Sequence, residues 1–159
     1  MEPTEKWIFR LRLRNRPGVL SALTALFADR GVSLDSLTAH DSGGSGASYG
    51  TTILTFTAGA SKKDYLARLL GRLAAVEALT EFRYDDAEHA RKSALIRAGL
   101  SGDALLGRLP LGLLCDVVSE ADGQTLALLL GPPQALDAAL STLADEGLLV
   151  AMDSTVIVV

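Results

Sequence analysis

The chain has 159 residues and is 48% hydrophobic, which provides enough apolar material for one ordinary domain or for two small ones packed together. Its formal net charge of −4 argues against nucleic acid and anionic membranes as partners, and its single cysteine, Cys115, excludes an internal disulfide. The start of the chain lacks a secretory signal pattern and no apolar run reaches the ~18 residues of a membrane span, so we expect a soluble, uncleaved, cytoplasmic protein.

The first part of the chain begins with a strand pattern followed by a helix pattern. Residues 7–16 alternate apolar and basic side chains, which predicts a half-buried strand. Apolar residues from Val19 to Phe27 then recur at helical spacing. Pro17 is suited to the first turn of this helix, and Gly31 to the position just past its end.

Two strands and a second helix follow. Residues 32–40 and 51–57 favour strand, and the polar, glycine-rich segment 41–48 between them predicts a hairpin with a mobile tip. Ser61, with Asp64 three residues later, resembles a capping box with Asp in place of Glu, and the apolar stripe after it predicts a helix.

A last strand near residues 78–84 completes the order strand, helix, strand, strand, helix, strand. This order is the ferredoxin-like arrangement, a four-stranded sheet covered on one face by two helices. We therefore predict an α+β protein with a ferredoxin-like domain over residues 1–85. The charged, weakly apolar segment 86–92 is predicted to be a linker.

Residues 93–159 repeat much of this rhythm and predict a second small α+β domain with an apolar sheet. A brief helix is expected between Ser101 and Pro110, and a longer one opens at Pro132 and ends before Gly147. The predicted strands are 93–98, 113–118, 125–130, 148–152 and 155–159.

The most informative segment is the loop Asn15-Arg16-Pro17-Gly18-Val19-Leu20, between the first strand and the first helix. Gly18 lets a ligand approach the backbone, and the open N–H groups of a helix start favour a carboxylate such as that of an amino acid. Asn15 offers an acceptor for the ligand's ammonium and a donor for its carboxylate. The simpler interpretation is a Pro-Gly turn without a ligand, and the six residues alone leave both open.

This loop, followed after the helix by Arg30-Gly31-Val32-Ser33-Leu34, resembles the signature of ACT domains, a polar residue and Pro-Gly-x-Leu with a later Gly-x-Asn-Ile. ACT domains are regulatory modules that bind amino acids at interfaces between paired copies. The resemblance implies a homodimer whose effector site combines the loop of one copy with the second segment of the other. The implied site residues are Asn15, Arg16, Pro17, Gly18, Val19, Leu20, Ser33 and Leu34.

Over nearly its whole length the chain resembles the small subunits of acetolactate synthase. Its run Arg-Gly-Val-Ser-Leu-Asp-Ser-Leu-Thr at residues 30–38 is similar to their Arg-Gly-Tyr-Asn-Ile-Glu-Ser-Leu-Thr, and shorter matches follow at 94–96, 114–117 and 135–140. The resemblance implies a valine-like aliphatic effector, no cofactor, and a thiamine-dependent acetolactate synthase catalytic subunit as partner in branched-chain amino acid biosynthesis. Ser33 stands where the family has an asparagine, which leaves the effector's identity open.

Other chemistries find little support in the residues. Cys115 lies in an apolar run typical of an inert core thiol, and His40 and His89 belong to no cluster at metal-ligand spacing, so no metal is expected. The arginine row of the first strand fits a solvated sheet face better than an RNA platform.

No catalytic motif or phosphate-binding loop is visible, so we predict a regulatory subunit without a catalytic site of its own. The alternative is a stand-alone amino-acid-sensing ACT protein with a different partner, and an enzyme of unknown type is the third hypothesis.

Overall fold

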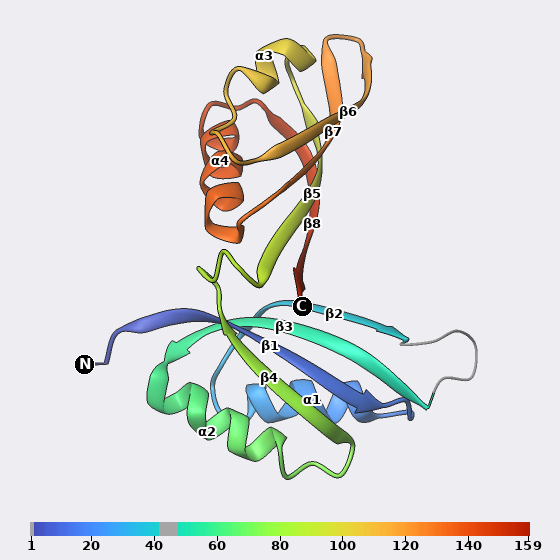
Figure 1. Cartoon of the computed structure of the whole chain (residues 1–159), viewed down its shortest axis with the longest axis vertical. Coiled ribbons are helices and arrows are strands. Elements are labelled where there is room, and N and C mark those ends of the chain that lie inside the picture. The colour runs from blue at the N-terminus through green and yellow to red at the C-terminus, as the bar shows by residue number, and fades with distance from the viewer. Residues whose placement is uncertain (1, 42–47) are drawn as a thin grey trace. The chain divides into compact units, whose positions relative to one another are not determined.

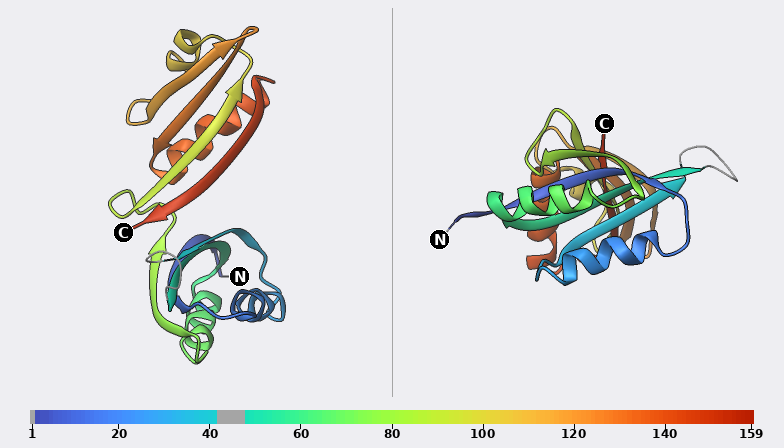
Figure 2. Two further views of the ribbon diagram at one scale, coloured as in Figure 1. Left: turned by 90° about the vertical axis from the view of Figure 1, so that its right-hand side faces the viewer. Right: turned by 90° about the horizontal axis from the view of Figure 1, so that it is seen from below.

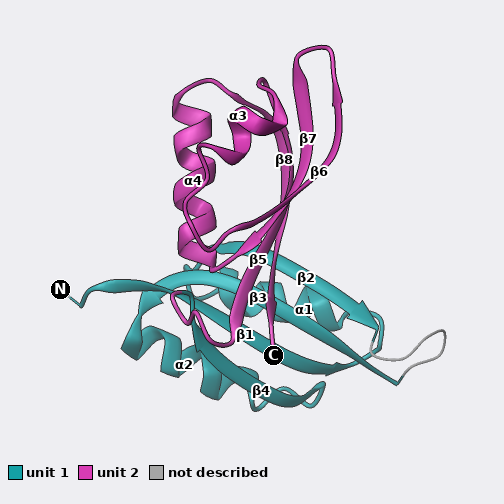
Figure 3. Ribbon diagram, turned by 45° about the horizontal axis from the view of Figure 1, so that its top comes forward, with its two compact units in different colours: residues 1–84 teal, residues 85–159 magenta. Residues whose placement is uncertain are grey.

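The computed structural model describes residues 2–41 and 48–159. Most of the hairpin tip predicted over residues 41–48 lies outside the described residues. The chain divides into two compact units, residues 1–84 (unit 1) and 85–159 (unit 2), which Figure 3 colours separately.

Unit 1 has the predicted ferredoxin-like order. It consists of β1 (Thr4–Arg14), α1 (Val19–Ala28), β2 (Leu34–Asp41), β3 (Tyr49–Gly59), α2 (Ala60–Leu70) and β4 (Val76–Arg83). The four strands form one antiparallel sheet in the order β2-β3-β1-β4. Both helices lie on the same face of this sheet (Figure 1), and the view from below in Figure 2 shows them lying over the strands.

The alternation along β1 determines which of its side chains enter the core of unit 1. Because neighbouring residues of a strand point to opposite faces, every second side chain is buried under the helices. Phe56 of β3 lies at the centre of this core and contacts Phe9 and Phe27 edge to face, with ring centroids 4.8 and 5.1 Å apart. The β1 residues in the core are Trp7, Phe9, Leu11 and Leu13.

The helix ends of unit 1 differ in part from the prediction. Gly18 is the residue before α1, with φ of +84°, so Pro17 precedes the helix instead of forming its first turn. Gly31, predicted to lie just past the end of the helix, lies three residues beyond Ala28, with φ of +65°. The capping box at Ser61 was wrong, because α2 begins one residue earlier and the Glu2 carboxylate accepts the N–H and the hydroxyl of Ser61, at 3.0 and 3.1 Å.

Unit 2 has the predicted α+β composition. It consists of β5 (Ala90–Ala98), α3 (Gly102–Leu106), β6 (Leu114–Ala121), β7 (Gln124–Gly131), α4 (Pro133–Asp145) and β8 (Leu149–Val158). Its antiparallel sheet has the order β6-β7-β5-β8, and α3 and α4 lie on one face of it (Figure 3). Residues 148–152 and 155–159, predicted as two strands, form the single strand β8, because Asp153 and Ser154 pair with β5 and continue the ladder.

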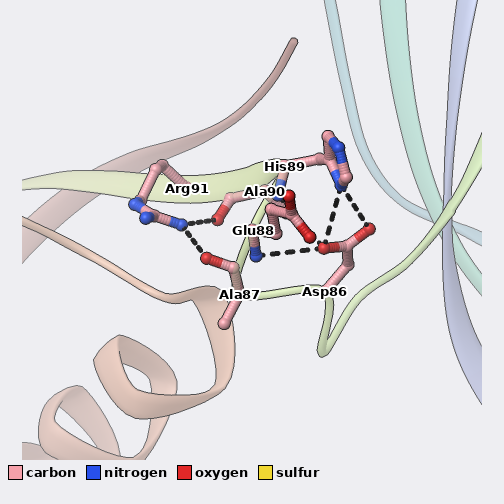
Figure 4. Close-up of polar contacts among 6 residues, drawn as sticks. All are labelled: Asp86, Ala87, Glu88, His89, Ala90 and Arg91. Carbon is pink, nitrogen blue, oxygen red and sulfur yellow. Dashed lines mark hydrogen bonds and ion pairs between the residues drawn. The ribbon is translucent and has the colours of Figure 1, made fainter.

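The segment predicted to be a linker is folded by its own polar groups (Figure 4). One oxygen of the Asp86 carboxylate accepts the backbone N–H groups of Glu88 and His89, at 3.0 and 3.1 Å, and Nδ1 of His89 lies 3.1 Å from the other oxygen. The bond from the His89 backbone contributes most to lowering the pKa of Asp86. Arg91 donates to the carbonyl of Ala87, and strand β5 already begins within the segment.

Candidate functional site

The loop between β1 and α1 separates two hollows on the surface of unit 1. One of about 280 Å³, the polar hollow, lies toward β2 and β3, and one of about 330 Å³, the apolar hollow, lies toward the segment between α2 and β4. The polar hollow is lined by Leu13, Arg14, Asn15, Arg16, Val19, Leu20, Ala39, His40, Asp41, Gly50 and Thr52. The apolar hollow is lined by Leu13, Arg16, Pro17, Gly18, Val19, Ala22, Leu23, Leu73, Ala74, Ala75 and Val76.

Asn15 connects the loop to the hairpin of β2 and β3. Its side-chain Nδ2 donates to Oδ1 of Asp41 at 3.0 Å, and its backbone N–H donates to the carbonyl of Ser48 at 2.9 Å. One of the two amide protons of Asn15 therefore serves to hold a carboxylate of its own chain. The contact places Asp41, the last residue of β2, at the edge of the polar hollow.

The N-terminus of α1 forms the positive side of the polar hollow. Gly18 has no side chain to accept from the first-turn N–H groups, and the first turn of α1 has no acidic residue. The N–H of Val19 donates to the carbonyl of Arg16 at 3.3 Å. A helix start still favours a negative group through the remaining N–H groups of its first turn and through the helix dipole. Arg14 and Arg16 line the same hollow and add positive charge near it.

The polar hollow thus offers opposite charges to a small ligand. Asp41 provides a carboxylate for an ammonium group, and the start of α1 with Arg16 provides donors for a carboxylate. Leu13, Val19 and Leu20 supply an apolar wall between the two. This combination suits a zwitterionic amino acid with a small aliphatic side chain.

The structure gathers six of the eight predicted site residues on one loop. Asn15, Arg16, Val19 and Leu20 line the polar hollow, whereas Pro17 and Gly18 line only the apolar one. Ser33 and Leu34 follow the far end of α1, so they lie away from the loop within one chain. Their assignment to the site of a neighbouring copy stays a prediction.

Sequence reasoning missed Asp41 and did not assign His40 to the effector site. Asp41 lies 26 residues from its partner Asn15, and the contact arises only because β3 pairs with both β1 and β2. No local pattern in the sequence indicates it. The glycine-rich segment that begins after Asp41 marked a hairpin end, which was the one available signal that this residue would lie beside the strand-to-helix loop.

The described residues contain neither a cluster of metal-ligating side chains nor a helix suited to a membrane. No group of three or more histidine, cysteine, aspartate or glutamate side chains in residues 2–41 and 48–159 is placed to hold a metal ion. None of the helices in the same part of the chain combines the length and the apolar character needed to cross a bilayer.

A comparison with protein families places the loop and its hollows in a known module. The model of the ACT domain matches residues 7–64, which run from β1 into α2 and include the whole β1–α1 loop. Unit 1 carries an ACT domain. The resemblance predicted from the Pro-Gly loop is thereby confirmed, and the ACT loop is the one that separates the two hollows.

One solved structure extends the likeness in fold to the whole chain. The acetolactate synthase small subunit from Thermotoga maritima is similar with a TM-score of 0.73 and 16% identity, covering 97% of this chain and 96% of that one. The ligand-free regulatory subunit of aspartate kinase from Thermus thermophilus has a TM-score of 0.48 and 14% identity, covering 90% of this chain and 94% of that one. No curated protein sequence matches the chain.

Proposed function

We propose that the chain is a regulatory protein without a catalytic site, whose ACT domain binds a small aliphatic amino acid at a homodimer interface and thereby modulates an acetolactate synthase catalytic subunit. One observation supports this most strongly. The ACT loop borders a hollow whose lining combines Asp41, held by Asn15, with the first residues of α1 and with apolar side chains.

The ligand's two charged groups have distinct partners in this proposal. Its carboxylate binds the N–H groups at the start of α1 and the guanidinium of Arg16, and its ammonium binds Asp41 beside Asn15. The aliphatic side chain contacts Val19 and Leu20. A ligand that lacks its ammonium or its carboxylate leaves one side of the hollow without a charged partner. Affinity therefore depends more on the α-amino and α-carboxyl groups of the ligand than on its side chain.

The edge strand β2 explains how Ser33 and Leu34 can join this site. β2 lies at the edge of the sheet, where unpaired N–H and C=O groups invite pairing with a second copy. Antiparallel pairing of two β2 strands about their middle sets Leu34 of one copy beside Asp41 of the other. Ser33 and Leu34 of the second copy then close the polar hollow of the first.

Regulation requires only that the ligand prefer one arrangement of the dimer. A coupling free energy of about 1–3 kcal/mol between the amino acid and the contact with the catalytic subunit changes the subunit's activity severalfold or more. Because the ligand contacts two chains in this proposal, its binding changes the strength and geometry of the β2 pairing directly.

Calorimetry of the full chain with valine, leucine and isoleucine tests the effector. We expect at least one to bind, Asp41→Asn to weaken that binding at least tenfold, and Gly18→Asp to abolish it. Asp64→Asn is the matched control, because Asp64 is an exposed carboxylate of α2 that pairs with Lys63 outside the hollow. If none of the three amino acids gave a heat of binding, the proposal of an aliphatic amino-acid effector would be refuted.

Two measurements test the partner and the dimer. Co-expression with an acetolactate synthase catalytic subunit should give a complex whose activity changes when valine is added. Amino-acid binding without any such complex would favour the stand-alone sensor instead. Light scattering of the free chain should report a dimer or larger species, and a monomer at micromolar concentration would contradict the shared site.

A further inference from the structure

The sheet of unit 2 has one covered and one open face. Helices α3 and α4 cover one face (Figure 3), and on that face the side chains of Ile96 and Leu129 are almost completely buried. On the opposite face, their neighbours Leu95 and Leu128 are 45% and 43% exposed. Leu95 and Leu128 lie directly opposite each other on β5 and β7, so their side chains form one apolar pair at the centre of the open face.

Further leucines extend this pair into a patch. Leu126 and Leu130 are the alternate residues of β7, and Leu114 of β6 lies opposite Leu130. We call the set Leu95, Leu114, Leu126, Leu128 and Leu130 the leucine face. Exposed apolar patches of a few hundred Å² on a protein surface are often functional, and contact with another protein is one such function.

The charges that border the leucine face have opposite signs. Arg97 lies two residues after Leu95 on β5, on the same face of the sheet. In the row of the Leu95–Leu128 pair, Asp153 of β8 lies beside Leu95 and Asp116 of β6 lies beside Leu128. Neither Arg97 nor Asp153 forms an ion pair within the residues that the structure describes. A positive and a negative group therefore stand at the rim of one apolar surface, each available to a second molecule.

A hollow on this face is suited to a guanidinium group. It has a volume of about 210 Å³, and Leu95 and Leu128 form its apolar side. The carboxylate of Asp153 and the hydroxyl-bearing residues Ser93 and Thr155 form its polar side. Arginine combines an apolar stem with a planar, charged donor group, so it matches both sides of such a hollow.

Two-fold symmetry supplies that arginine from a second copy. With strands about 4.8 Å apart and alternate residues about 6.8 Å apart, Arg97 and Asp153 each lie about 7 Å from the midpoint of the Leu95–Leu128 pair. We place a two-fold axis between the leucine faces of two copies, parallel to both sheets and over this midpoint. The axis bisects the angle between the direction to Arg97 and the direction to Asp153. Rotation about it brings Arg97 of each copy opposite Asp153 of the other. Both ion pairs then form at once, as an interface between identical copies requires.

We propose that the leucine face of unit 2 is an interface between two copies of this chain, in which Arg97 of each copy enters the hollow beside Asp153 of the other. The leucine face together with Asp153 of β8 spans four strands and about three rows of side chains, which is about 400 Å² per copy, whereas a standard interface buries about 800 Å² per partner. The contact is therefore weak alone and becomes populated when another contact already holds the two copies together. It is separate from the amino-acid site and does not depend on a ligand.

Cross-linking of the full chain tests the position of the contact. In a Cys115→Ser background, Leu128→Cys places a thiol near the proposed axis, and a short bismaleimide should join two copies through it. Gln134→Cys is the control, because Gln134 is exposed on α4, on the covered side of the sheet, and should not cross-link. Equal yields at the two positions, or no product at Leu128→Cys, would overturn the proposal.

Charge exchange tests its symmetry. Arg97→Asp and Asp153→Arg should each lower the Leu128→Cys cross-linking rate at least tenfold, because like charges then meet. An equimolar mixture of the two variants should restore it, because both ion pairs of the mixed dimer are again opposite in sign. Asp116→Arg is the matched control, since Asp116 lies at the same distance from the midpoint but outside the hollow. A mixture of Asp116→Arg with Arg97→Asp should not restore the cross-linking rate. Restoration by Asp116→Arg but not by Asp153→Arg would overturn the assignment of Asp153.

Discussion

Replacing Gly18 by alanine tests the backbone on which the proposed effector site is built. Gly18 has φ of +84° and ψ of −10°, a left-handed conformation that costs an L-residue about 1–2 kcal/mol. A Cβ atom at this position would meet no heavy atom within 4 Å, so a clash adds nothing to that strain. We therefore expect Gly18→Ala to lower the free energy of unfolding of unit 1 by about 1–2 kcal/mol.

Gly71 provides a matched control in the same unit. It follows α2 with φ of −63° and ψ of −14°, where alanine is unstrained, and a Cβ atom would lie 3.5 Å from the carbonyl oxygen of Ala67. This distance is an ordinary van der Waals contact. Gly71→Ala should leave the free energy of unfolding unchanged or raise it by about 0.4–1 kcal/mol, because alanine reduces the entropy of the unfolded chain.

Urea unfolding followed by tryptophan fluorescence measures both variants. Trp7 is the single tryptophan of the chain and is 9% exposed in the core of unit 1, so its emission reports on this unit alone. The two substitutions should shift the midpoint in opposite directions, or shift it only for Gly18→Ala. Equal losses of stability in both variants, or none in Gly18→Ala, would refute the argument from the left-handed loop.

Three further predictions concern the rest of the molecule. Leu129→Ala should lower the free energy of unfolding of unit 2 by about 2–5 kcal/mol, measured by circular dichroism in urea, because Leu129 is fully buried under the helices. The Asp86 carboxyl should titrate below the usual pKa near 3.8 in carbon-13 NMR, since the backbone N–H of His89 donates to its charged form; the stabilisation is complete above the usual pKa and is lost as the pH falls through the lower value. Cys115 should react slowly with a thiol reagent at pH 7 and faster in more alkaline solution than an exposed thiol would require, because burial raises the pKa of its thiol above the ordinary value.

The parts of the fold that the sequence predicted are those set by local periodicity. The alternation in residues 7–13 indicated both the strand and its buried face, because side-chain direction in a strand depends only on position along it. The order of strands and helices was sufficient for the ferredoxin-like arrangement of unit 1. Asp122 and Gly123 form the turn between β6 and β7, both with positive φ, as an Asp-Gly pair between two strand patterns favours.

The parts that the sequence did not predict depend on residues far apart in the chain. Glu2 replaces the predicted cap at Ser61 from 59 residues away, and Asp41 at the end of β2 reaches Asn15, which follows β1, across the intervening strand β3. Local propensity favours a turn at the polar residue Asp153, so the sequence pattern predicts a break there between strands 148–152 and 155–159. Pairing with Leu95 keeps it in the ladder, and no local pattern contains that information.

The most direct test of the central claim is to map the binding of valine, leucine or isoleucine on the backbone amides of the full chain by NMR. The account predicts that the largest shifts occur in the β1–α1 loop, at the end of β2 near Asp41, and at Ser33 and Leu34, and that the last two shift in parallel with the loop because a second copy supplies them. Amides that stay unmoved at saturating concentrations of all three amino acids, or shifts confined to unit 2, would contradict an effector site at the ACT loop.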